Sequence, residues 1–206
     1  FTSPMRASLV AAHLGPNQHF PNSFLIAYKL SGHPFTNRVE LAASVLGVQG
    51  GRGAPKGSFV DHVQDLIPPL KYLLPDNTTQ FSNKMAGWEY RLRLPELSGL
   101  ELYAEHAFDD MDPRRWASTF WQDGGHIFGA SLSDLGPGGA LSSAWEFHHT
   151  GLRFYKYGVF LSGMTFNGTL FGDPLGNQGD GGYMRLDWDN GGDRRSSLDL
   201  AIERRD

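Results

Sequence analysis

Large apolar and polar side chains alternate along much of this 206-residue chain. The clearest example is 88–94 (WEYRLRL), where every second residue is large and apolar and the intervening residues are charged. Successive side chains of a β-strand point to opposite faces, so this pattern predicts a strand with one apolar and one polar face. The pattern recurs at 24–30, 38–45, 100–105, 145–148, 184–188 and 197–203, and more weakly at 4–13 and 125–134. We therefore predict roughly nine strands.

The segment around 95–99 (PELSG) predicts a hairpin between two of these strands. Closure of the hairpin about Leu97 places Arg93 opposite Glu101 and Arg91 opposite Tyr103. Cross-strand pairs of opposite charge stabilise a sheet by a few tenths to about 1 kcal/mol.

The connections between the predicted strands alternate in length. Short ones lie at 31–37, 95–99, 135–139 and 189–195, and long ones at 47–82, 108–124 and 149–181, with 14–22 a fairly short exception on the long side. Outer-membrane barrels have short periplasmic turns and longer extracellular loops. We predict an all-β, antiparallel up-and-down transmembrane β-barrel, with 1–206 as a single barrel region.

The first long connection contains a helical pattern. Apolar residues recur there at helical spacing, at Phe59, Val60, Val63, Leu66 and Ile67. Pro68 and Pro69 end the predicted helix, because proline cannot continue one. We interpret it as a short helix folded on the surface of its own loop; the alternative is a plug at the mouth of the barrel.

Composition fits this architecture. The 26 Gly, 12 Pro and 13% aromatic residues suit short strands and turns, and the net charge of −4 gives no support for nucleic-acid binding. The absence of Cys excludes disulfides and thiolate metal sites. Mean hydropathy is −0.35, as expected where only alternate residues face lipid.

Strand direction indicates an incomplete barrel. With the short turns in the periplasm, the first and last predicted strands both run outward, and their number is odd. Closed bacterial barrels have an even strand number. The terminal Glu203, Arg204, Arg205 and Asp206 also lack an aromatic residue. We expect 1–206 to be a partial barrel and a fragment of a larger one.

The segment 83–110 (NKMAGWEYRLRLPELSGLELYAEHAFDD) resembles a hairpin of the Wzi-like capsule assembly proteins. Within 144–188, AWEFHHTG, RFYKYGVFLSG and LFGDPLGNQGDGGYMRLDW extend the resemblance. It implies a large barrel in the outer membrane of a Gram-negative cell, in contact with outer-membrane lipid. It also implies a lectin-like, non-enzymatic role with capsular or other surface polysaccharide as partner.

Charged residues on the polar side of the strands form a predicted lumen ladder. Its members are Arg38, Glu40, Glu89, Arg91, Arg93, Glu101, Glu105, Glu146, Arg185, Asp187 and Asp199. Paired carboxylates can hydrolyse glycosides, so the alternative is an enzyme that uses two of Glu89, Glu101 and Glu105. We favour a ladder in which carboxylates match arginines and no residue is catalytic.

No metal site or cofactor is predicted. The adjacent His148 and His149 point to opposite faces of a strand, and His106 and His126 have no ligand-like spacing to them. The acidic stretches 109–112 and 187–190 lack the spacing of a calcium loop and suit turns.

Aromatic and charged residues of the outer loops are the predicted polysaccharide-binding residues. They are Arg114, Arg115, Trp116, Trp121, Arg153, Tyr155, Lys156, Tyr157 and Asp173, with Phe120 and Phe171 as further stacking candidates. Aromatic rings could stack on sugars, and charged groups could bind hydroxyls. Alternatively, the rings form the upper aromatic girdle or pack the loops together.

We therefore predict a protein that attaches or assembles surface polysaccharide. One rival is a porin-like solute channel with a charged lumen, which bilayer conductance would reveal. The other is a soluble all-β carbohydrate-active enzyme, which should be monodisperse without detergent, whereas a lipid-facing apolar surface should aggregate.

Overall fold

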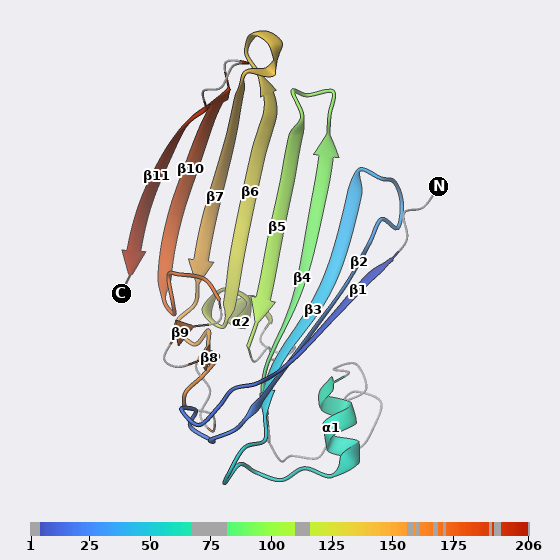
Figure 1. Cartoon of the computed structure of the whole chain (residues 1–206), viewed down its shortest axis with the longest axis vertical. Coiled ribbons are helices and arrows are strands. Elements are labelled where there is room, and N and C mark those ends of the chain that lie inside the picture. The colour runs from blue at the N-terminus through green and yellow to red at the C-terminus, as the bar shows by residue number, and fades with distance from the viewer. Residues whose placement is uncertain are drawn as a thin grey trace.

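A computed structural model describes residues 5–66, 82–109, 116–155, 159, 161–166, 169–170, 172–189, 191 and 195–205 (Figure 1). The elements are β1 (Arg6–His13), β2 (Phe24–Gly32), β3 (Val39–Gln49), α1 (Phe59–Leu66), β4 (Ser82–Leu94), β5 (Leu100–Phe108), α2 (Trp116–Gln122), β6 (Gly124–Leu135), the 3-10 turn η3 (Pro137–Gly139), β7 (Leu141–Thr150), β8 (Thr165–Phe166), β9 (Thr169–Leu170), β10 (Gly179–Asp189) and β11 (Arg195–Arg205).

Nine strands form one antiparallel sheet in the order β1-β2-β3-β4-β5-β6-β7-β10-β11. Each strand pairs with its neighbours along the chain, and the small β8–β9 hairpin lies in the connection between β7 and β10. Within the described ranges, β1 and β11 each have a single strand partner, so the sheet is open. The up-and-down, nine-strand prediction is confirmed.

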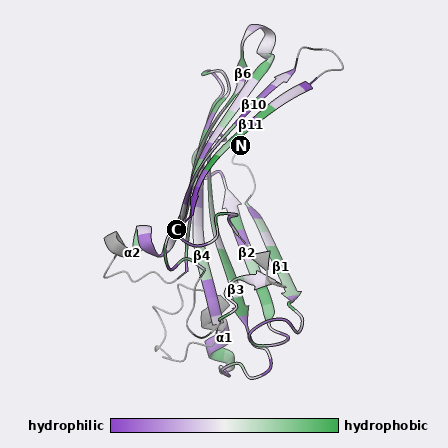
Figure 2. Cartoon of the chain, turned by 90° about the vertical axis from the view of Figure 1, so that its left-hand side faces the viewer, coloured by the Kyte–Doolittle hydropathy of each residue, from purple (hydrophilic) through white to green (hydrophobic). Residues whose placement is uncertain are grey.

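The strand register sorts the residues into two faces. Leu92 lies opposite Val39 on one side and Leu102 on the other, so large apolar positions of adjacent strands share a face, to which Trp88 also belongs. This apolar face continues through Tyr28, Phe128, Trp145, Phe147, Met184 and Leu200. Many of these side chains are exposed, among them Tyr90 at 44% and Leu200 at 52%. Figure 2 shows hydrophobic colour recurring along the strands.

The two ends of the sheet differ. The four short connections lie at one end, at the top of Figure 1, and the loops carrying α1, α2 and β8–β9 lie at the other. The predicted alternation of short and long connections is thus reproduced. In the β4–β5 turn, Ser98 and Gly99 have positive φ values of 53° and 64°. The register pairs Arg93 with Glu101 and Arg91 with Tyr103, as predicted.

The α1 helix lies where helical spacing predicted one. Ser58 and Asp61 cap its start reciprocally: the Ser58 N–H donates to Asp61 Oδ2 at 2.6 Å, and the Asp61 N–H donates to Ser58 Oγ at 3.3 Å. Phe59 is 82% exposed, in accordance with a surface helix. Ile67, Pro68 and Pro69 lie outside the described residues. The second helix, α2, was not predicted.

A hydrophobic core lies on the polar face of the sheet, at the end with the long loops. Its buried members are Leu14, Leu25, Val48, Met85, Phe154, Tyr155 and Met164. Leu25, Val48 and Met85 come from strands, whereas Phe154, Tyr155 and Met164 come from the connection between β7 and β10. Described residues of the β7–β10 connection therefore pack onto the polar face of the sheet.

We expect a substitution in β6 to lower the free energy of unfolding by an amount that depends on which face of the sheet carries the new side chain. Ala130 lies on the apolar face between Leu102 and Trp145, and Ser131, the next residue, faces Glu101 on the polar side. In a bilayer, A130R should lower the free energy of unfolding by about 2–4 kcal/mol, because a buried guanidinium loses its water. S131R should cost less than about 1 kcal/mol.

The measurement is reversible guanidinium unfolding of the full-length protein in lipid vesicles. Equal losses for the two variants would show that hydrocarbon does not contact the apolar face.

Candidate functional site

The polar face carries linked ion pairs across β3, β4 and β5. Arg93 lies between two carboxylates: its Nη2 is 2.9 Å from Glu40 Oε2, and its Nε is 3.0 Å from Glu101 Oε2. Arg91 also pairs with Glu101. Each link joins neighbouring strands, so the pairs fix the relative positions of three strands.

Lys29 extends this network to β2. Its Nζ lies 2.6 Å from Glu89 Oε2, on the far side of β3. Glu89 is the register partner of Glu105 on β5, so Lys29 supplies positive charge where two carboxylates meet. Both Glu89 and Glu101 are thus held in ion pairs, which favours the charge-ladder interpretation over an acid pair.

Tyr103 continues the network toward β7. Its hydroxyl donates to Glu146 Oε1, and the ring crosses above Gly129 of the intervening strand β6. A Cβ atom on Gly129 would lie 2.1 Å from Tyr103 Cζ. The guanidinium carbon of Arg91 lies 5.1 Å from the centre of the same ring, within cation–π range. Gly129 therefore lets the ring reach across a strand.

The remaining ladder residues lie in more exposed places. Arg185 Nε is 2.8 Å from Asp187 Oδ2, and Arg185 Nη1 is 3.9 Å from Asp199 Oδ1. Arg38 precedes β3 and pairs with Glu96 at 2.6 Å in the β4–β5 turn. Exposed pairs of this kind contribute little stability.

The register therefore places ten of the eleven predicted ladder residues on the polar face, and Arg38 at its turn end. Whether this face lines a lumen stays a prediction.

Two predicted loop residues, Tyr155 and Asp173, contact each other on the polar side of the sheet. The Asp173 N–H donates to the Tyr155 hydroxyl at 2.8 Å, and the Leu175 N–H donates to Asp173 Oδ1 at 2.9 Å. Burial raises the pKa of Tyr155 to about 12. Burial also opposes ionisation of Asp173, but hydrogen bonds from His148 and Leu175 outweigh it and lower the pKa of this carboxyl. Asp173 is therefore an ionised anchor of the loop.

A cavity of about 510 Å³ lies between this loop and the wall. Its strand side is mainly apolar, with Val10, Ala27, Leu46, Met85 and Ala107 among its lining residues. Phe154, Tyr155 and Pro174 of the loop also line it, and Glu105, His148 and Asp173 supply its charged groups. Its size falls in the range of small-ligand pockets.

The opposite, apolar face carries a row of histidines near the same end. His106, His126 and His149 are register partners on β5, β6 and β7. The α2 helix covers the row: His126 Nε2 donates to the Phe120 carbonyl at 2.8 Å, and His149 Nε2 donates to the Trp121 carbonyl at 3.0 Å. In Figure 2, α2 lies to the left of the strands, and the edge of the sheet formed by β1 and β2 lies to the right, away from α2.

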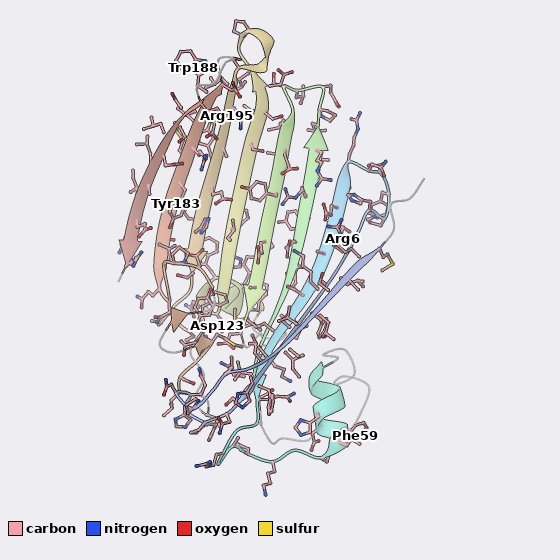
Figure 3. The ribbon with its side chains drawn as sticks, in the orientation of Figure 1. Arg6, Phe59, Asp123, Tyr183, Trp188 and Arg195 are labelled. Atoms are coloured by element: carbon pink, nitrogen blue, oxygen red, sulfur yellow. The ribbon has the colours of Figure 1, made fainter. Side chains whose placement is uncertain are left out.

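Trp121 lies flat against this row. Its ring stacks on His149 with a centroid distance of 3.8 Å, and Trp121 is 44% exposed. Beside α2, the Arg153 N–H donates to the Gln122 carbonyl at 3.2 Å, and Arg153 Nη2 donates to Asp123 Oδ2 at 2.8 Å. Figure 3 labels Asp123 at this end of the sheet. An indole and a guanidinium are thus exposed together at the outer rim.

The predicted polysaccharide residues fall into separate groups. Trp121 and Arg153 are exposed beside α2, whereas the side chains of Tyr155 and Asp173 are buried between the β7–β10 loop and the polar face of the sheet. Arg114, Arg115, Lys156, Tyr157 and Phe171 lie outside the described residues, and of Trp116 only the backbone is described. Phe120 packs on His106 and His126. Their role in binding stays a prediction.

Sequence reasoning missed α2 and the histidine row. Helix α2 has seven residues, too few for a periodic signal. The histidines are scattered in sequence and meet only through strand register, although counting residues outward from the 95–99 turn pairs His106 with Trp88. Within the described ranges, no group of three or more His, Cys, Asp or Glu side chains is arranged to hold a metal ion. No helix among the described residues is long and apolar enough to cross a membrane.

The sheet is apolar on one face and charged on the other, and its long loops lie at one end. These are the features of the wall of an outer-membrane β-barrel. The family comparison is specific. The model of the capsule assembly protein Wzi family matches residues 1–205, and the chain belongs to that family. No curated protein and no solved structure matches the chain.

Gly129 gives a test of the polar network. G129A should displace the Tyr103 ring and its bond to Glu146, and lower the free energy of unfolding by about 1–3 kcal/mol. The control is G182A on β10, where an added Cβ meets no atom within 4 Å. Unfolding in lipid vesicles measures both variants. A G129A protein as stable as G182A would mean that the ring has no fixed position over β6.

Proposed function

We propose that this chain forms part of an outer-membrane protein that holds capsular polysaccharide at the cell surface by lectin-like binding, without catalysis. The observation that carries the proposal is the family match over 1–205, which supports a role in capsule assembly. The two-faced sheet supports a membrane location, because a continuous exposed apolar face needs an apolar solvent. The same exposed face speaks against a soluble enzyme.

The rim beside α2 is the best-supported contact surface for the polymer. Trp121 is 44% exposed, and the Arg153 side chain is 58% exposed. A flat aromatic ring can cover the apolar face of a sugar, and a guanidinium can donate to hydroxyls or acidic groups. Tyr155 and Asp173 act differently in this proposal: both are buried and position the loop.

Trp121 and Trp188 make a matched pair for testing the rim. Both are exposed tryptophans on the apolar side, Trp121 at the long-loop end and Trp188 at the short-turn end, 44% and 57% exposed. In cells carrying the full-length protein, W121A should reduce retained polysaccharide several-fold, because it removes the stacking surface, whereas W188A should leave it unchanged. The measurement is the ratio of cell-bound to released polysaccharide in cells that contain equal amounts of each variant protein. Equal retention in both variants would remove Trp121 from the binding surface.

A solute channel is the second candidate, because the charged face lies away from the apolar one. The charges on that face are largely matched in pairs, and Phe154, Tyr155 and Met164 of the β7–β10 loop pack onto it, which favours an anchor. Planar-bilayer recordings separate the two functions: an anchor should pass little current, and steady large conductance would support the channel.

We also propose that further strands of the same protein cover the two open edges. In hydrocarbon, unpaired backbone N–H and C=O groups cost several kcal/mol each, and β1 and β11 are exposed along nearly their whole length. A protein isolated from outer membranes with an intact mass near the 22.8 kDa of this chain would overturn this proposal.

A further inference from the structure

His148 lies between two carboxylates on the polar face, near the end of β7. Its Nδ1 contacts Asp173 Oδ2, and its Nε2 lies 3.0 Å from Glu146 Oε2. The His148 and Asp173 side chains are 11% and 9% exposed. Glu146 belongs to the wall and Asp173 to the loop, so the imidazole joins the two.

Both contacts require His148 to donate. An ionised carboxylate only accepts hydrogen bonds, and a neutral imidazole has a single N–H. Glu146 already accepts from Tyr103, and Asp173 already accepts from the Leu175 N–H. The arrangement is therefore that of a doubly protonated imidazolium, whose Nδ1–H bonds Asp173 while its Nε2–H bonds Glu146.

The surroundings favour the positive charge. On β5, Glu105 faces the same cavity, and on β6 the register partner of His148 is the apolar Ile127. On β10, the Tyr183 ring lies edge-on with its centroid 4.6 Å from that of His148. Other charged groups around the site are Lys29 on β2 and Glu203 and Arg205 on β11.

Asp173 controls how the loop sits on the cavity. Through its backbone it is bonded to Tyr155, and its neighbour Pro174 lines the cavity with Phe154. At its base, the loop is held by backbone bonds from Gly151 to Gly124 and from Gln178 to Gly151. Those bonds do not change with pH, whereas the His148 link does.

We propose that His148 is a pH-sensitive latch: its protonated form holds the loop residues 151–155 and 172–178 closed over the cavity, and its deprotonation releases them. Loss of one proton leaves one imidazole nitrogen with a lone pair facing a carboxylate, so one of the two bonds becomes repulsive. The closed state is stable below the pH at which His148 titrates and is lost as pH rises. At acid pH a second limit applies: the pKa of Asp173 is lowered, so its bond is present at neutral pH and is lost as pH falls through that value. This inference goes beyond the proposed polysaccharide role and does not depend on it.

Thiol accessibility provides the test, because these 206 residues contain no cysteine, and any cysteine elsewhere in the full-length protein is first replaced by serine. M164C in the full-length protein places a thiol at a position of this loop that is 0% exposed, and L161C places one at a position of the same loop that is 72% exposed. Dividing the maleimide labelling rate of M164C by that of L161C removes the pH dependence that the two thiols share. From about pH 6 to about pH 8 this ratio should rise about tenfold, because histidine titrates in that interval.

Two variants of the neighbouring histidines isolate the latch. H148Q should give a high ratio that no longer changes with pH. H149Q is the matched control: His149 also contacts a carboxylate, Asp180, and a carbonyl, Trp121, but on the opposite face. With H149Q the pH dependence should persist. Hydrogen exchange of 151–155 and 172–178 in the full-length protein without introduced cysteines gives a second readout if M164C does not fold. A pH-independent ratio with His148 present, or the same pH dependence in H148Q, would overturn the proposal.

Discussion

The structure depends on one constraint: successive side chains of a β-strand point to opposite faces of the sheet. The position of a residue in the strand therefore decides whether its side chain lies on the apolar or the charged face. The register keeps this assignment consistent across nine strands, so Tyr90, Phe128 and Trp145 share one face while Arg91 and Glu146 share the other. A slip of one residue in any pair would turn apolar residues of a strand toward the charged side. Among the described strand pairs, the one shift in register lies between Leu132 and Leu135 at the short-turn end, where a bulge does not disturb the centre of the sheet.

The same alternation gathers the charged side chains on one face of the sheet. A wall that is apolar on one side must place its polar side chains together on the other, where unmatched charges would be costly. Arg93 between Glu40 and Glu101, and Tyr103 reaching Glu146 across Gly129, distribute these charges over adjacent strands. Because the arginines are partly exposed, each pair contributes modestly to stability, and their combined effect is to fix strand positions.

The end of β7 is where the wall connects to its loops. His148 and His149 are adjacent and point to opposite faces, so one contacts the inner loop through Asp173 and the other contacts α2 through the Trp121 carbonyl. The same strand thereby positions the roof of the inner cavity and the exposed rim with Trp121 and Arg153. The proposed polymer contact near Trp121 and the position of the β7–β10 loop therefore depend on different faces of the sheet.

Local pattern in the sequence determined the strands, the alternation of long and short connections, the α1 helix and the Arg93–Glu101 register, because each depends on residues near one another in the chain. The family resemblance was likewise carried by contiguous segments and is shown by the match over 1–205. Only the tertiary structure decided which loop residues meet. Trp121 and Tyr155 looked equivalent as loop aromatics, yet one lies on the outer rim and the other is buried inside. Their placement depends on how loops of 15 or more residues pack on the two faces of the sheet, which no short-range periodicity encodes.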